Sequence, residues 1–248
     1  MALETPNRTR SRTNPRRRHL SGQDGPTDKE REYLEIIYYL TARDEPVISA
    51  RLADWMGVQP PTVTHVVKQL EAKHYITRNE RGEISFTPEG FAKAQEVVRR
   101  HRILERFLVD VMRMPWHLIH EEAVRLEHAL SPMMETQIEK LVGESSTCPH
   151  GNPIPGMCKE YMGKVRLDEA PAERQFTIRR IIEEAEEDSE LMRYLQSNDL
   201  MPNSQFTVID SSTAFGVTLQ RRNHNITVSP EIAAVLWGDV EPLERPIE

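Results

Sequence analysis

From residue 27 to residue 142, apolar side chains recur at intervals of three and four residues, the spacing that predicts helices with one buried face. Residues 27–30, Thr-Asp-Lys-Glu, have the pattern of a capping box, so we expect a first helix from there to residue 40. A second helix is predicted at 49–56, because Gly57 follows it as a typical helix-ending residue. A third is predicted at 60–73, since it opens on two prolines, which suit the first turn of a helix.

After the third helix the pattern becomes extended. Two short β-prone runs, 75–77 and 84–86, flank a polar loop, which is typical of a β-hairpin. Thr87 and Pro88 then predict the start of a long helix that reaches about residue 112. Beyond Pro115 we expect two further amphipathic helices, at about 119–129 and 132–141.

Helix, helix, glycine turn, helix and hairpin are the order of a winged helix-turn-helix, in which the second helix of the pair enters the DNA major groove. The exposed face of the predicted helix 60–73 carries short or flat hydrogen-bonding side chains, which suit base edges and phosphate oxygens. Nearby basic residues are candidates for neutralising phosphates. The predicted DNA-contacting residues are Arg51, Gln59, Pro61, Thr62, Thr64, His65, Lys68, Arg78 and Arg81, with Gln69 and Lys73 beside them. The alternative is an ordinary amphipathic helix bundle with a solvated polar face.

The last third of the chain has a different character. Residues 143–162 are rich in glycine, serine and proline and predict a linker. Beyond it, five β-prone runs and one short helix at 189–196 predict a small β-barrel. The β-prone runs lie at 164–167, 176–182, 206–209, 214–219 and 226–228. The whole chain is therefore predicted to be mainly α with a small β domain: a disordered basic tail (1–26), a winged helix-turn-helix (27–90), a helical domain (91–142), the linker (143–162), the barrel (163–240) and a C-terminal tail (241–248).

Composition narrows the class of protein. The chain of 248 residues is 38% hydrophobic, with a mean hydropathy of −0.58, and it has no apolar run long enough to span a bilayer, so we expect no membrane segment. Two cysteines are too few to stabilise a chain of this length by disulfide bonds, which favours a protein of the reducing cytoplasm.

The charge is unevenly distributed. Residues 1–26 hold six arginines and two acidic residues, a net charge of +4, whereas the whole chain carries −7. A basic arm on an acidic body indicates a polyanionic partner near the N-terminus, the alternative being a tail without a partner. Residues 27–90 hold eight basic and eleven acidic residues, so DNA affinity there must depend on where each charge lies.

Carboxylates and imidazoles recur at helical spacing on three of the predicted helices. The pairs Glu32/Glu35 and His101/Glu105 each share one helix face, and on a further helix His120, Glu127 and His128 share another. Such groups on facing helices are how helical bundles build divalent transition-metal sites. The competing interpretation is that Arg102, Arg106 and Arg125 form salt bridges with these glutamates.

Several stretches resemble the diphtheria-toxin-repressor family of metal-dependent regulators. They are EYLEIIYYL (32–40), VQPPTVTHVVKQLE (58–71), RRHRILERFL (99–108), HEEAVRLEHALS (120–131) and HGNPIPG (150–156). The resemblance covers almost everything except the N-terminal tail. It implies an N-terminal winged helix, a helical metal-binding and dimerisation domain, and a C-terminal SH3-like (FeoA-type) barrel.

The resemblance also implies metal ligands by position. The activating site of the iron-responsive members corresponds to Glu32, Val124, Glu127 and His128. In the manganese-responsive members an Asp-x-x-Glu pattern, similar to Glu32-x-x-Glu35, and a position matching His101 complete the site. An ancillary site corresponds to His101, Glu105 and His120, completed by barrel residues for which Glu187 and Glu190 are the best matches.

Val124 departs from this pattern, because both branches of the family place a metal-binding side chain at that position and valine has no donor atom. An activating site that is weak, that uses Glu35 in compensation, or that is not the principal site would each fit. The remaining oxygen and nitrogen donors favour Mn(II) or Fe(II) over a thiophilic metal.

The sequence thus predicts a cytoplasmic, homodimeric transcriptional repressor, most simply of metal-uptake genes. Mn(II) or Fe(II) would bridge its DNA-binding and dimerisation domains and so raise its affinity for a double-stranded DNA operator. One alternative is a winged-helix regulator of the same fold without metal control. A remote one is a metal-dependent hydrolase, although we find no Ser/His/Asp grouping, P-loop or GxGxxG motif. Cys148, His150 and Cys158 could supply three zinc ligands, but an irregular loop is the simpler interpretation.

Overall fold

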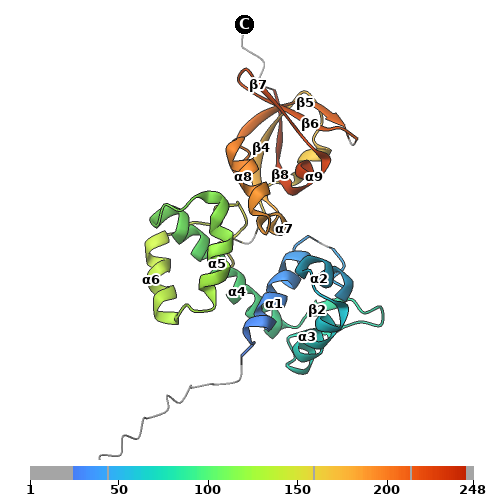
Figure 1. Cartoon of the computed structure of the whole chain (residues 1–248), viewed down its shortest axis with the longest axis vertical. Helices are drawn as coiled ribbons and strands as arrows, with labels where there is room; N and C mark the ends of the chain where they lie inside the picture. Colours follow the sequence, from blue (N-terminus) through green and yellow to red (C-terminus); the bar gives the residue numbers. More distant parts are fainter. Residues whose placement is uncertain (1–24, 44, 159, 213, 244–248) are drawn as a thin grey trace, which may run out of the picture.

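The structure is a computed structural model that describes residues 25–43, 45–158, 160–212 and 214–243. The predicted basic tail, apart from its last two residues, and the end of the predicted C-terminal tail lie outside the described residues. Three lobes are visible in Figure 1: a helical lobe with a short hairpin, a second helical lobe, and a β lobe at the C-terminal end. The predicted class, mainly α with a small β domain, is confirmed.

The first lobe consists of α1 (Asp28–Thr41), α2 (Ser49–Met56) and α3 (Pro60–Ala72), followed by the antiparallel strands β1 (Ile76–Arg78) and β2 (Ile84–Phe86). The capping box of α1 is present in both directions, and Gly57 ends α2 in the left-handed conformation, with φ of 60°. The apolar stripes that the sequence predicts meet in one core, which includes Leu34, Leu52 and Val67. This is the winged helix-turn-helix that the sequence predicts.

The second lobe begins with α4 (Pro88–Arg106), which starts in contact with the hairpin. A Cβ at Gly90 would lie 1.7 Å from the carbonyl oxygen of Tyr75, so only glycine permits this approach. The helix continues as a π-helical turn, η1 (Phe107–Val111), and so reaches the predicted end near residue 112. A 3-10 turn, η2 (Trp116–Leu118), then leads into α5 (Ile119–Glu127) and α6 (Pro132–Val142).

The β lobe is a six-stranded antiparallel sheet in the order β3-β8-β4-β5-β6-β7. Its strands are β3 (Val165–Arg166), β4 (Arg174–Ile181), β5 (Gln205–Ser212), β6 (Gly216–Arg221), β7 (His224–Val228) and β8 (Leu236–Pro242), joined by η3 (Leu167–Glu169), α7 (Glu183–Glu186), α8 (Ser189–Ser197) and α9 (Pro230–Val235). The sequence predicts five of these strands and α8 but misses β8, which lies inside the sheet between β3 and β4. The sequence pattern does not indicate this strand, because it contains Gly238 and Pro242 and both residue types are depleted in strands.

The described residues of the predicted linker, 143–158 and 160–162, contain no helix or strand, but part of this segment is buried. His150, Asn152 and Ile154 are fully buried. The backbone of His150 accepts a hydrogen bond from Ile181 N–H (2.9 Å), and the Asn152 amide donates to the Ile181 carbonyl (2.8 Å). The segment is thereby fixed to β4, and one apolar core runs from the end of α4 into the sheet.

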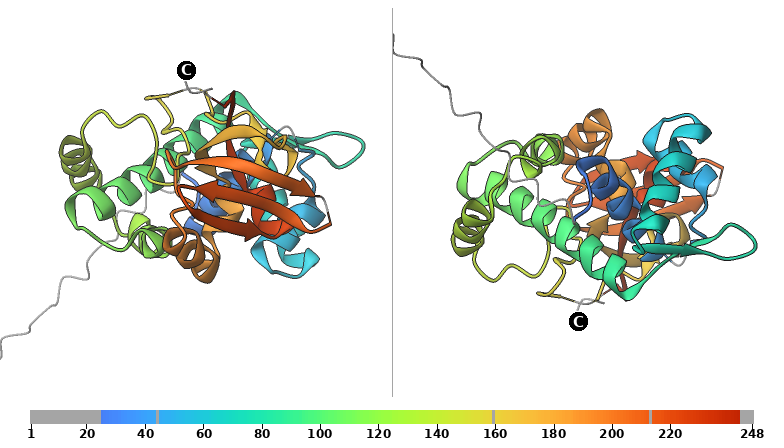
Figure 2. Two further views of the ribbon diagram at one scale, coloured as in Figure 1. Left: turned by 90° about the horizontal axis from the view of Figure 1, so that it is seen from above. Right: turned by 90° about the horizontal axis from the view of Figure 1, so that it is seen from below.

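The lobes converge on α4. Helix α1 packs along it from the first lobe, and α5 and α6 pack on it within the second (Figure 2). Helix α7 brings the β lobe to the same place (Figure 1). Among the helices that the structure describes, none combines the length and apolar character that crossing a bilayer requires.

Candidate metal centre

Three helices aim carboxylates and imidazoles at one buried region. The i,i+4 spacing of His101 and Glu105 places both on the inner face of α4, where they are 1% and 0% exposed. Helix α5 contributes His120 and Glu127, and α1 contributes Glu35, all of them buried. Five of the ligands that the sequence predicts from helical spacing therefore lie together in the structure.

The first cluster joins Glu35, His101 and Glu127, whose candidate donor atoms all lie within 4.8 Å of one another. His101 Nδ1 lies 3.0 Å from Glu127 Oε2 and 3.9 Å from Glu35 Oε1. The cluster opens into a cavity of about 270 Å³ that Val124 also lines. Three donors thus come from α1, α4 and α5, and the side chain of Val124 faces them without one.

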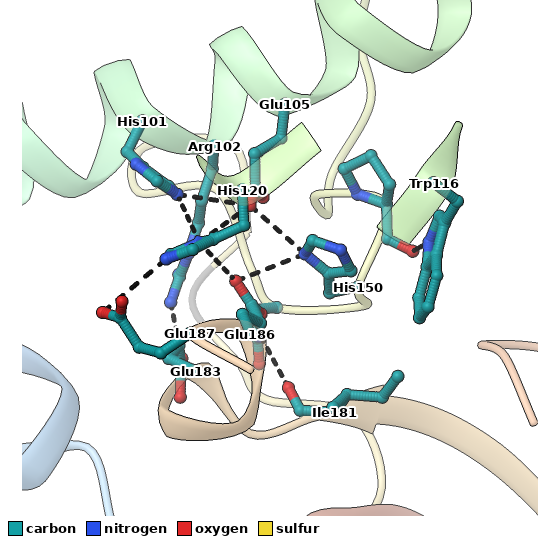
Figure 3. A network of polar contacts seen from close by, with 12 residues as sticks. His101, Arg102, Glu105, Trp116, His120, His150, Ile181, Glu183, Glu186 and Glu187 are labelled. Atoms are coloured by element: carbon teal, nitrogen blue, oxygen red, sulfur yellow. Dashed lines mark hydrogen bonds and ion pairs between the residues drawn. The ribbon is translucent and has the colours of Figure 1, made fainter. Parts of the chain in front are cut away.

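The second cluster joins His101, Glu105, His120 and Glu186 (Figure 3). His101 Nε2 lies 3.2 Å from Glu105 Oε1, and His120 Nδ1 lies 3.2 Å from Glu186 Oε2. His120 Nε2 is 3.7 Å from Glu187 Oε1, so Glu187, which the resemblance implies as a ligand, lies at the edge of the cluster. His101 belongs to both clusters and connects them.

The segment that follows α6 adds two donors, Cys148 and His150, which the sequence analysis considered only for a separate zinc site with Cys158. Cys148 and His150 form a third group with Glu105, and His150 Nδ1 lies 3.2 Å from both Glu105 Oε1 and Glu186 Oε2. Cys158 is outside these groups. The sequence could not show that His150 points toward Glu105, because an irregular loop has no periodicity from which the direction of a side chain could be inferred.

Three predicted ligands lie at the margin or outside. His128 Nε2 is 3.8 Å from Glu32 Oε1 and 3.7 Å from Glu127 Oε1. His128 and Glu32 therefore lie at the mouth of the first cluster, and both are partly exposed. Glu190 is exposed on the first turn of α8 and belongs to none of the clusters. The buried Glu186 of α7 occupies the place expected for it, because the four-residue helix α7 turns that side chain inward.

The arginines of these helices pair elsewhere. Arg102 pairs with Glu183 at 2.7 Å, Arg106 with Asp110 at 3.5 Å, and Arg125 with Glu121 and Glu122. The competing interpretation, in which these arginines form salt bridges with Glu32, Glu35, Glu105 or Glu127, is therefore wrong for the described contacts. The clustered carboxylates face histidines instead.

The protonation states follow from burial and mutual charge. Burial raises the pKa of Glu35 to about 7, although His101 acts in the opposite direction. Burial alone would lower the pKa of His101, but the charges of Glu35 and Glu105 and its hydrogen bonds raise it to about 10. Despite burial, which would raise it, His150 and His101 hold the pKa of the Glu105 carboxyl well below its usual range. Without metal, imidazoles that lie between carboxylates, such as that of His101, thus remain protonated at neutral pH.

The donor set fits a divalent transition metal. Glu105 Oε2, His120 Nε2 and both ring nitrogens of His150 are buried and form no hydrogen bond within the described residues. Unsatisfied buried polar atoms are costly, and a shared cation is one way to satisfy them. Oxygen and imidazole donors suit Mn(II) and Fe(II), while Cys148 adds one soft donor to the third group.

The predicted DNA face is only partly free. Gln59, Pro61, Thr64, His65 and Lys68 are exposed on or just before α3, Thr62 is half-buried, and Arg81 is exposed in the hairpin loop. Arg51 instead pairs with Glu184 (2.7 Å) and Arg78 with Glu71 (2.5 Å). These two predicted phosphate contacts are engaged within the protein in this state.

The chain matches three family profiles in the order of its lobes. Residues 27–83 match "Iron dependent repressor, N-terminal DNA binding domain", residues 87–156 match "Iron dependent repressor, metal binding and dimerisation domain", and residues 165–239 match the FeoA domain. The iron-dependent repressor IdeR of Mycobacterium tuberculosis is 33% identical over 218 residues, which are 83% of this chain and 94% of that protein. The diphtheria toxin repressor of Corynebacterium diphtheriae is 30% identical over 208 residues, 82% of this chain and 88% of that one.

Solved structures agree with these matches. The crystal structure of T. acidophilum IdeR superimposes with a TM-score of 0.69 at 26% identity, over 88% of this chain and 99% of that one. A manganese-dependent transcriptional repressor in complex with manganese superimposes with a TM-score of 0.73 at 27% identity, over 84% and 98%. This chain therefore belongs to the family of iron- and manganese-dependent, DNA-binding transcriptional repressors.

Proposed function

We propose that Mn(II) or Fe(II) activates this repressor by joining its DNA-binding lobe to its helical lobe at Glu35, His101 and Glu127. The observation that carries the proposal is the cluster itself, since its three donors come from α1 of one lobe and from α4 and α5 of the other. A bound cation would neutralise the carboxylates of Glu35 and Glu127, which otherwise repel each other, and would be coordinated by both. Glu32 and His128, at the mouth of the cavity, are the nearest additional donors.

We propose that the metal affects DNA binding by shifting the equilibrium between orientations of the DNA-binding lobe relative to the helical lobe. Helix α1 packs on both α3 and α4, so fixing α1 against α4 and α5 also fixes where α3 points. A metal at about 100 times its dissociation constant that binds only the competent state stabilises that state by about 2.7 kcal/mol, or roughly a hundredfold in affinity. That is sufficient for a transcriptional switch.

The second cluster has a different proposed role. Glu186 belongs to it and comes from the FeoA lobe, and His150 lies beside it, 3.2 Å from both Glu105 and Glu186. A cation held with Glu105 and His120 would therefore fasten the FeoA lobe and the segment around His150 to α4 and α5. We infer that this site stabilises the arrangement of the lobes, while the first cluster controls the DNA-binding lobe.

We propose that the repressor acts as a homodimer on a DNA operator with two half-sites in successive major grooves. The match to a dimerisation domain supports this, as do exposed apolar side chains on α6 and at the end of η1: Val111, Met112, Met133, Met134 and Leu141. Control of metal-uptake genes, action in the cytoplasm and the absence of any enzymatic activity belong to the same proposal.

One observation favours a second candidate, a repressor of the same fold without metal control. Val124 lines the cavity where the family resemblance implies a donor. Operator sequences selected from a random DNA library by the Mn(II)-loaded protein provide the test. We expect metal-free protein to bind the selected DNA at least tenfold more weakly. A difference of less than about threefold would favour the second candidate.

A further inference from the structure

The cavity at the first cluster contains a phenol that is not itself part of the cluster. Tyr39 lies one helical turn beyond Glu35 on α1, and its hydroxyl donates a hydrogen bond of 2.5 Å to Glu35 Oε1. Tyr39 is 5% exposed and Glu35 is 8% exposed, so water does not compete appreciably for this bond. The same Glu35 oxygen is the one that lies 3.9 Å from His101 Nδ1.

The ring of Tyr39 is fixed by two neighbours from other elements. It stacks on Trp55 of α2, with centroids 6.1 Å apart and an interplanar angle of 24°. The guanidinium of Arg102 lies over it, 5.4 Å from the ring centroid. Arg102 is itself fully buried and held by Glu183 of α7 and by the Pro153 carbonyl. The hydroxyl therefore has little freedom to leave Glu35.

We infer that Tyr39 is a positioning residue that fixes the carboxylate of Glu35 in the orientation needed to bind the metal. The inference rests on the proposed function, because it requires a cation at Glu35, His101 and Glu127. Hydrogen-bond partners of metal-binding carboxylates typically account for 10- to 100-fold in metal affinity. Val124 leaves the first cluster without a donor at its position. The metal affinity therefore depends more strongly on Glu35, which is the member of this cluster that comes from the DNA-binding lobe.

The direct test is the Mn(II) affinity of Tyr39→Phe, which keeps the ring on Trp55 and removes only the hydroxyl. We expect Mn(II) to bind this variant about 10- to 100-fold more weakly in isothermal titration calorimetry. We expect the DNA affinity at saturating Mn(II) to stay within threefold of wild type. Tyr38→Phe is the matched control, because Tyr38 is the preceding residue of the same helix, stacks on Phe91 and does not line the cavity of the first cluster.

A double-mutant cycle shows whether Tyr39 acts through Glu35. Glu35→Ala and Glu35→Ala/Tyr39→Phe should bind Mn(II) equally, because without the carboxylate the hydroxyl has nothing to orient. A purely structural Tyr39 would instead lower the melting temperature of the metal-free protein and the DNA affinity at saturating Mn(II).

The Mn(II) affinities of the single variants distinguish a failure of the inference from a failure of the proposed function. If Tyr39→Phe binds Mn(II) as tightly as wild type while Glu35→Ala does not, Tyr39 has no positioning role and the proposed function stands. If Glu35→Ala and Glu127→Ala both bind Mn(II) like wild type, the metal does not bind at the first cluster, and the proposed function fails together with the inference.

Discussion

Glu184 of the FeoA lobe and Arg51 of the DNA-binding lobe form a two-point ion pair, with Oε2 2.7 Å from Nη2 and Oε1 3.0 Å from Nη1. Although burial alone would raise it, the bonds to Arg51 and Arg43 lower the pKa of the Glu184 carboxyl. The same short helix, α7, sends Glu186 into the second cluster. One turn of the FeoA lobe therefore contacts both the DNA-binding lobe and the candidate metal centre.

This pairing predicts that Arg51 contributes little to phosphate binding. Lys68→Ala, which removes an exposed charge from α3, should reduce the slope of log K against log salt by about one. Arg51→Ala should change the slope by much less, because Glu184 already neutralises this side chain. The measurement is DNA binding at a series of salt concentrations. Equal changes in the two variants would show that Arg51 leaves Glu184 for a phosphate when DNA binds.

The raised pKa values of Glu35 and His101 predict that the thermal stability of the metal-free protein depends on pH. Glu35 and His101 keep their protons up to about pH 7 and about pH 10, against ordinary pKa values of 4.5 and 6.5. The folded state thus binds more protons than the unfolded state in these windows, so the stability that these groups provide is present at lower pH and lost as pH rises through them. We expect the melting temperature without metal to fall between pH 6.5 and pH 10.

Metal binding must displace those protons, because imidazole coordinates only when it is neutral. At pH 7, Mn(II) should therefore release at least one proton from His101. Calorimetry in two buffers of different ionisation enthalpy measures this number. Binding that releases no proton would mean that His101 is not a ligand.

Glu186 rather than Glu190 is expected to contribute to the second cluster. Glu186→Ala should reduce the rise in melting temperature that Mn(II) produces and weaken the second binding event by about tenfold or more. Glu190→Ala removes the same charge from an exposed position nearby and should leave both quantities unchanged. The reverse ranking would restore the assignment that the family resemblance implies.

The exposed apolar side chains of α6 and η1 predict the dimer interface. Met133 is 72% exposed, and Met133→Glu would place a charge in an apolar contact. Sedimentation velocity should show a dimer for the wild type and a shift toward monomer for this variant. A variant that remains dimeric at the same concentrations would exclude this face.

The sequence predicts those parts of the fold and site that local signals specify. The capping box, Gly57 and the prolines of α3 delimit the winged helix, and i,i+4 spacing brings His101 and Glu105 onto one helix face. Glu186 could not be found in this way, because α7 is a single turn and has no periodicity to read. The pairing of Arg51 with Glu184 joins residues 133 positions apart and depends on how the lobes pack, which spacing alone does not reveal.

The most direct test of metal bridging is a Mn(II) titration of DNA binding by wild type, Glu127→Ala and Glu121→Ala. Glu127 is buried in the first cluster, whereas Glu121 is exposed on the same helix and paired with Arg125. We predict that Mn(II) raises the DNA affinity of wild type and Glu121→Ala roughly a hundredfold, and that of Glu127→Ala less than threefold without loss of folding. Equal activation of Glu127→Ala and wild type would contradict the account.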